Sequence, residues 1–128
     1  MVESGLEAFF GDYASAFNRF DRLAICRSLW CPCLMVGPDS VSVLATEDAI
    51  RANTEALLRH HEAAGFGRAV ASVVSVRTLG SGLALSTVDW RVEKPDGALL
   101  WQFTNTYNLI ERGGCWRIAV STTHGAGA

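Results

Sequence analysis

The fold of this chain is decided by the stretch from Leu99 to His124, LLWQFTNTYNLIERGGCWRIAVSTTH. This stretch predicts two long β-strands joined by a tight turn at Arg112-Gly113-Gly114, because side chains alternate between the two faces of a strand. On the first strand one face carries Leu99, Trp101, Phe103, Asn105, Tyr107 and Leu109. On the second strand one face carries Trp116, Ile118, Val120, Thr122 and His124. An apolar wall that holds an amide, a phenol and an imidazole is suited to line a pocket.

The rest of the chain predicts helices first and strands last. Period-two patterns indicate strands at 68–79 and 83–93 and shorter strands at 33–36 and 41–44. Apolar residues at helical spacing over 6–20 predict a first helix whose aromatic stripe includes Tyr13 and Phe17. Asp21 and Thr46 are suited to cap a second and a third helix, and Gly65 to end the third. The predicted class is α+β, with three helices packed in the concave face of a curled, mostly antiparallel sheet of about six strands.

Composition excludes several classes of protein. The chain has 128 residues and a net charge of −2, and no Lys/Arg cluster alternates with aromatic residues, so we expect no nucleic-acid partner. No apolar run approaches the roughly 20 residues that cross a bilayer, and Glu3 and Glu7 argue against a secretory signal, so we expect a cytoplasmic protein without a membrane partner. Neither the cysteine spacing nor the three histidines predict a metal site, and we expect no cofactor. We expect one domain over residues 1–124 and a flexible tail over 125–128.

The order of helix, helix, short hairpin, helix and four-strand meander resembles the NTF2-like superfamily. The local patterns that accompany this resemblance are Phe17-Asn18-Arg19-Phe20-Asp21, Asp96-Gly97, Thr106-Tyr107-Asn108-Leu109 and Trp116-Arg117-Ile118 leading to His124. The superfamily includes SnoaL-type polyketide cyclases and ketosteroid isomerases, so the resemblance implies a cystatin-like cone with a deep pocket between sheet and helices. It also implies a homodimer through the outer face of the sheet, where we expect Leu100 and Ile110.

The ketosteroid isomerases require a carboxylate base and two hydrogen-bond donors to the enolate oxygen. The resemblance places Tyr13 on their oxyanion tyrosine and Asn105 near their second donor, an aspartic acid. It places Gly37 on their catalytic aspartate, and glycine cannot move a proton. Ketosteroid isomerase activity is therefore not expected.

Other groups remain as candidates for acid/base chemistry. The catalytic candidates are Tyr13, Asp89 and His124, and His124 is expected on the same face as Trp116. Either Asp89 or Trp90 faces inward, and the pairing of Asp89 with Arg91 favours an outer position for Asp89. His61 either enters the pocket or binds carbonyl groups at the end of the third helix.

We expect the pocket to take a small hydrophobic or aromatic ligand. The residues expected to bind it are Tyr13, Phe17, Trp30, Trp101, Phe103, Asn105, Tyr107 and His124. Two classes of function remain open at this point. One is a cofactor-free cyclase, isomerase or dehydratase, and the other is a non-catalytic dimeric module that binds a ligand or a protein.

Overall fold

The computed structural model describes residues 1–127 and contains α1 (Val2–Asn18), α2 (Arg22–Arg27) and α3 (Glu47–Ala64). α2 and α3 begin at residues whose side chains cap them, whereas α1 begins after Met1 without a side-chain cap. The Asp21 carboxylate accepts a hydrogen bond from the Ala24 amide at 3.2 Å, and the Thr46 hydroxyl accepts one from the Ala49 amide at 3.1 Å. Gly65 ends α3 with φ of 88°, a conformation that a residue without Cβ adopts at least cost. The three predicted caps are confirmed. Within residues 1–127, no helix has both the length and the apolarity that a membrane span requires.

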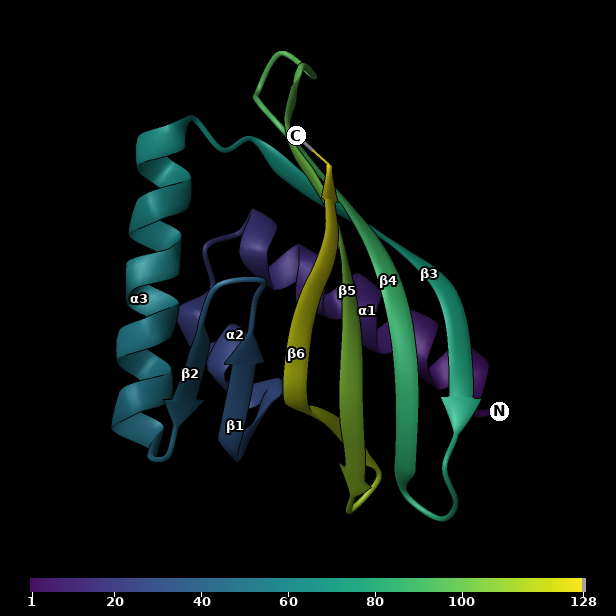
Figure 1. Ribbon diagram of the computed structural model, residues 1–128. Helices are drawn as coiled ribbons and strands as arrows, with labels where there is room; N and C mark the ends of the chain where they lie inside the picture. The colour runs from purple at the N-terminus through teal and green to yellow at the C-terminus, as the bar shows by residue number, and fades with distance from the viewer. Residues whose placement is uncertain (128) are drawn as a thin grey trace.

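Six strands form one sheet in the order β2-β1-β6-β5-β4-β3 (Figure 1). Their bounds are β1 (Leu29–Val36), β2 (Val41–Leu44), β3 (Arg68–Thr78), β4 (Leu83–Glu93), β5 (Leu99–Arg112) and β6 (Cys115–Gly127). Neighbouring strands are antiparallel except for β1 and β6, which run parallel. The α+β class and the mostly antiparallel sheet of six strands are therefore confirmed.

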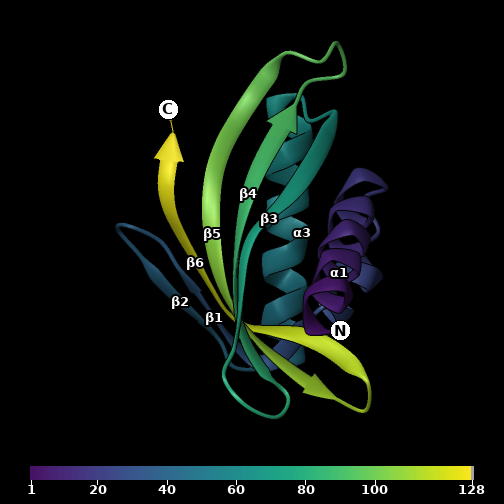
Figure 2. The same ribbon diagram turned by 90° about the vertical axis from the view of Figure 1, so that its right-hand side faces the viewer.

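The helices cover one face of the curved sheet and leave the other face bare (Figure 2). The predicted stripe on α1 is buried from Leu6 to Phe17, and its aromatic rings reach the central strands, whereas Phe20 lies beyond the end of the helix and is exposed. The centroid of the Phe10 ring lies 4.8 Å from that of Tyr107 on β5, and the centroid of Tyr13 lies 6.1 Å from that of Trp90 on β4. Edge and tilted contacts of this kind stabilise a core beyond the area that they bury. The concave face and α1 therefore share one aromatic core.

Two strand boundaries differ from the sequence-based expectation. β1 begins at Leu29 rather than at residue 33, because Leu29 pairs with Ile118 of β6 and the Ile118 amide donates to the Ser28 carbonyl at 2.8 Å. Pairing across the sheet thus overrides the local helical pattern at the end of α2. β6 continues to Gly127, which pairs with Gln102, whereas a tail was expected from residue 125. Residue 128 of that expected tail lies outside the described residues.

The last strand contains a β-bulge. Asn108 of β5 pairs with Val120, but the next residue, Leu109, pairs with Ile118. Ala119 is therefore the extra residue on β6. A bulge of this kind reverses which alternate residues face the core on either side of it, because two residues of one strand then oppose one residue of the other.

The bulge moves His124 off the face that the sequence predicts. Ser121 and Thr123 face the helices together with Met35 of β1, which pairs with Ser121. His124 pairs with Thr104 and lies on the outer face. The prediction that His124 shares a face with Trp116 is wrong, because uninterrupted alternation was assumed along the whole strand.

Candidate functional site

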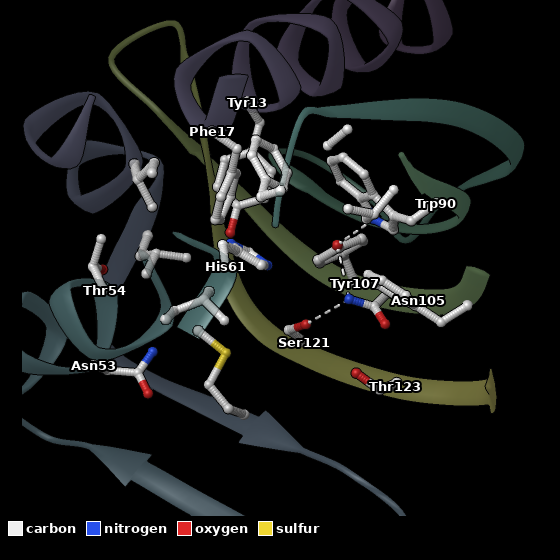
Figure 3. Close-up of a pocket in the computed structure, with 18 residues that line it drawn as sticks. Tyr13, Phe17, Asn53, Thr54, His61, Trp90, Asn105, Tyr107, Ser121 and Thr123 are labelled. Atoms are coloured by element: carbon white, nitrogen blue, oxygen red, sulfur yellow. Dashed lines mark hydrogen bonds between the residues drawn. The ribbon is translucent and has the colours of Figure 1, made fainter. Parts of the chain in front are cut away.

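A cavity of about 290 Å³ lies between the concave face of the sheet and the helices (Figure 3). Every element except β2 contributes to its wall. The lining residues are Tyr13, Phe17, Ile25, Leu29, Met35, Asn53, Thr54, Leu57, His61, Phe66, Ala69, Trp90, Val92, Phe103, Asn105, Tyr107, Ser121 and Thr123. A mainly apolar and aromatic wall with a few polar groups is typical of a small-molecule site.

The structure brings five of the eight expected ligand-binding residues together in this wall. They are Tyr13, Phe17, Phe103, Asn105 and Tyr107. They come from α1 and β5, the helix and the strand on which the sequence analysis depends most. Periodicity placed these side chains correctly because α1 is a continuous helix and β5 pairs with β4 in unbroken register from Phe103 to Tyr107.

Two expected tryptophans lie outside the cavity. Trp30 follows Leu29 on β1, and Leu29 takes the position in the wall. The Trp30 ring packs instead under the guanidinium groups of Arg112 and Arg117, at 5.8 and 6.0 Å from its centroid. Trp101 stacks on His60 with 5.3 Å between ring centroids, beside the end of α3.

Two catalytic candidates, Asp89 and His124, lie on the outer face of the sheet. The Asp89 carboxylate accepts a hydrogen bond from the Thr104 hydroxyl at 2.7 Å, and the His124 Nε2 atom and the Thr106 hydroxyl are 2.6 Å apart. Both side chains are exposed, and Trp90 takes the inward position next to Asp89. Neither group reaches a molecule inside the cone.

A hydrogen-bonded network crosses three strands in the wall of the cavity (Figure 3). The Tyr107 hydroxyl accepts a hydrogen bond from Trp90 Nε1 at 2.8 Å and another from Asn105 Nδ2 at 3.0 Å. Asn105 Nδ2 also donates to the Ser121 hydroxyl at 3.3 Å. Burial raises the pKa of Tyr107 to about 12, although these hydrogen bonds partly oppose the rise. The Tyr107 phenol is therefore neutral and structural at physiological pH.

The Asn105 side chain is only partly satisfied. Both of its bonds use Nδ2, and Oδ1 is buried with no hydrogen-bond partner among the described residues. A buried acceptor without a partner costs about 1–3 kcal/mol. Such groups are few in native structures and call for a specific explanation.

His61 enters the cavity, which resolves the alternative left open by the sequence. Its ring packs among aromatic rings, with centroid distances of 5.7 Å to Phe17, 5.0 Å to Phe66 and 5.4 Å to Trp101. The Nδ1 atom is buried with no partner among the described residues. Burial, with a smaller effect from adjacent His60, lowers the pKa of His61 to about 4. The imidazole is therefore neutral at pH 7.

The hydroxyl of Tyr13 has a different environment from that of Tyr107. It makes no hydrogen bond to any side chain within residues 1–127, although the ring lines the cavity. Burial raises the pKa of Tyr13 well above its ordinary value of 10.0, with a smaller effect from nearby Tyr107. Tyr13 thus presents a neutral phenol to the cavity.

Sequence reasoning missed Ser121 and Thr123 as members of the wall, and it did not name Trp90 among the ligand-binding residues although it favoured the inner face for Trp90. The run Ile118-Ala119-Val120 is apolar throughout, so it carries no alternation from which the position of the bulge can be read. The sequence therefore gives no signal that Ser121 and Thr123 face the cavity. The alternation of side chains along the strand 83–93 is regular, and the sequence left open only whether Asp89 or Trp90 faces inward.

The wall contains few groups that can transfer a proton. Among the described residues that line it, the ionisable ones are Tyr13, His61 and Tyr107, and no carboxylate is present. Gly37, at the position of the isomerase base in the resemblance, lies in the turn between β1 and β2 and does not line the cavity. The arrangement is suited to hold a neutral molecule by shape and hydrogen bonds.

The fold and the cavity define a cone of the NTF2-like class. The chain belongs to the family described as NTF2-like protein (DUF6841), whose model matches residues 3–126. Among curated proteins, none matches the sequence.

Solved structures show the same fold at low sequence identity. An NTF2-like protein of unknown function from Shewanella oneidensis MR-1 is 13% identical, with a TM-score of 0.79, and the match covers 96% of this chain and 98% of that one. A ketosteroid isomerase-like protein from Erwinia carotovora atroseptica is 17% identical, with a TM-score of 0.71 and coverage of 94% and 92%. The protein Aln2 from a Streptomyces species is 14% identical, with a TM-score of 0.74 and coverage of 97% and 90%. These likenesses establish the fold alone.

The two tyrosines of the cavity provide a matched test of this geometry. Tyr107→Phe leaves the Trp90 indole and one N–H of Asn105 without an acceptor, so we expect the free energy of unfolding to fall by about 1–3 kcal/mol. Tyr13→Phe removes a hydroxyl without a side-chain partner, so we expect a change within about 0.5 kcal/mol. Urea denaturation of both variants measures the difference. Equal losses would contradict the network.

His61 predicts a dependence of stability on pH. The pKa of His61 is about 4 in the folded protein and near its ordinary 6.5 when the chain is unfolded, so the unfolded state binds an extra proton between these values. The free energy of unfolding is therefore expected to fall as the pH is lowered from about 6.5 to about 4. Comparison of urea denaturation at several pH values measures this component, which His61→Phe should lack. The exposed variant His124→Gln should retain it, and a loss in both variants would refute the assignment.

Proposed function

We propose that this protein binds a small, mainly hydrophobic, aromatic molecule inside the cone. The observation that carries the proposal is the cavity of about 290 Å³, in which aromatic rings surround a few polar groups without hydrogen-bond partners. A volume of this size is near the lower limit for small-molecule sites, which favours a compact ligand of one to three rings.

Two further features support a binding role. Phe17, Trp90 and Phe103 supply flat apolar surfaces in the wall, which suit the faces of a planar ligand. The Tyr13 hydroxyl supplies a polar atom that makes no hydrogen bond to a described side chain. A polar side chain that is already fixed in the wall loses little conformational entropy when a ligand binds to it.

Blocking the opening tests this proposal. Leu57 of α3 lines the cavity and is 37% exposed, so we expect Leu57→Trp to extend across the opening and to weaken ligand binding at least about tenfold. A library of aromatic and polyketide-like compounds, screened by native mass spectrometry and thermal shift, supplies the ligand. Leu23→Trp is the matched control, because Leu23 is exposed on α2 outside the cavity. Binding that survives Leu57→Trp would place the ligand elsewhere.

The proposal has a catalytic form, a cofactor-free cyclase, isomerase or dehydratase. Since the described wall has no carboxylate and Asp89 and His124 face outward, His61 is the group that would carry the proton. A basic nitrogen with a pKa of about 4 is a weak base, which favours the binding form. Conversion of a captured compound that ceases in His61→Phe, with binding retained, would support the catalytic form.

We further propose that two copies of the chain pair through the outer face of the sheet. A row of mostly apolar side chains runs across this face in register, namely Val43, Leu34, Val120, Asn108 and Leu85. Val43 is 65% exposed, and the helices cover only the opposite face (Figure 2). Exposed apolar surface of this kind is typical of association sites. Leu100 packs partly against the core, so the row replaces it as the basis of this proposal.

Sedimentation velocity at micromolar concentration tests the pairing. We expect a dimer for the wild type and a monomer for Val43→Arg, because an arginine buried without a partner in the interface is costly. Leu23→Arg, on the helical side of the molecule, is expected to remain a dimer. A wild type that is monomeric under these conditions would rule the proposal out.

A further inference from the structure

A second concave site lies outside the cone, where α2, the start of β1 and the first turns of α3 meet (Figure 1). Its volume is about 630 Å³, which is within the range of small-molecule sites. Leu29 lines both this site and the cavity of the cone, and it is the only described residue that does so. The two spaces therefore lie on either side of one wall and have different linings.

The lining of this second site is rich in positive charge. Its ionisable side chains other than cysteine are Arg22, Arg27, Arg51, Arg117 and Glu47. Four of the eleven Lys and Arg residues of the chain thus face one groove, in a protein whose net charge is −2. We call this site the basic groove. A concave surface lined by one sign of charge concentrates ligands of the opposite sign.

The arginines of the basic groove differ in whether they already have a partner. Arg22 pairs with Glu55 and Arg51 with Asp48, each at 2.9 Å. Arg27 and Arg117 make no ion pair within residues 1–127. The groove therefore holds two guanidinium groups whose charge no carboxylate of the described chain neutralises.

Trp30 positions one of these groups. The guanidinium of Arg117 lies over the indole ring at 6.0 Å from its centroid, and that of Arg112 lies over the same ring at 5.8 Å. A contact with a ring face restrains a guanidinium but supplies no acceptor oxygen, so the N–H groups of Arg117 remain available to an anion. Arg112 adds a further positive charge beside the groove.

The floor of the basic groove is apolar. Leu29 and Ile50 line it and are 6% and 3% exposed, and half-buried Trp30 lines it as well. A ligand that fits both parts combines an apolar body with an anionic group. Two unpaired guanidinium groups favour about two negative charges on that group. A phosphate monoester carries this charge at pH 7 on three acceptor oxygens, which suit the forked donors of arginine.

We propose that the basic groove binds a phosphate monoester with a compact apolar substituent. Arg27 and Arg117 donate to the phosphate oxygens, and the substituent lies against Leu29, Ile50 and Trp30. This site goes beyond the proposed function, because the wall of the cone contains no Lys or Arg among its described residues and so disfavours a dianion.

Three anions test the proposal by isothermal titration calorimetry on the full chain at pH 8 and low ionic strength. They are phenyl phosphate, phenyl sulfate, which has nearly the same shape with a single charge, and inorganic phosphate, which lacks the apolar part. We expect phenyl phosphate to bind the wild type about tenfold more tightly than either of the others. Equal affinity for phenyl phosphate and either of the other two would overturn the proposal, as would the absence of saturable binding.

Arginine variants locate the site. We expect Arg27→Gln and Arg117→Gln each to weaken the binding of phenyl phosphate at least about tenfold, because each removes a charged donor. Arg77→Gln is the matched control, since Arg77 is exposed on β3 outside the groove and the change in net charge is the same. Equal affinities in the three variants would contradict the assignment to the groove.

One further variant separates this site from the cone. Leu57→Trp, which is designed to block the cavity of the cone, should leave the binding of phenyl phosphate unchanged. Loss of binding in Leu57→Trp would place the anion in the cone and overturn the proposal. Failure of phenyl phosphate to bind leaves the proposed binding of aromatic molecules intact, because that binding uses the other space. All three arginines are exposed, so we expect their variants to fold.

Discussion

The Tyr107 hydroxyl is the atom on which the geometry of the cavity depends. It accepts hydrogen bonds from Trp90 of β4 and from Asn105 of its own strand, and Asn105 reaches onward to Ser121 of β6. Three neighbouring strands are thereby joined through side chains on their inner face, in addition to their backbone ladder. Because buried polar groups persist only in arrangements that satisfy most of them, the network fixes the side-chain conformations of the wall. The aromatic stripe of α1 then packs against a surface that is already defined.

The bulge at Ala119 makes this network possible. With regular alternation, β6 would present Val120 and Thr122 to the inner face, and the second N–H of Asn105 would meet a methyl group instead of the Ser121 hydroxyl. The extra residue turns Ser121 and Thr123 inward and sends His124 outward to Thr106. Bulges are frequent beside functional sites because they redirect side chains without changing the overall fold. The polar character of the wall therefore originates in a local irregularity of one strand.

The sequence predicted what local chemistry determines. Asp21, Thr46 and Gly65 mark helix ends through their own side chains or backbone, and regular periodicity placed Tyr13 and Asn105 in the wall. The errors share one physical origin, because they concern how one strand pairs with its neighbour, which local sequence does not determine. The apolar run 118–120 gives no sign of the phase change after it, so His124 was placed on the wrong face. The start of β1 at Leu29 is set by pairing with β6, which lies about 90 residues further along the chain.

The distribution of ionisable groups in the described wall favours the proposed binding role over acid/base chemistry. The Asp89 carboxylate is on the outer face of the sheet, and the resemblance to the ketosteroid isomerases places Gly37 where those enzymes carry their base. An amide at Asn105 holds a fixed polarity at every pH, whereas a carboxylic acid at that position would change charge. His61, the remaining basic group, is kept neutral by burial. Selectivity in such a wall comes from shape and from the direction of hydrogen bonds, since no formal charge is available to attract or repel a ligand.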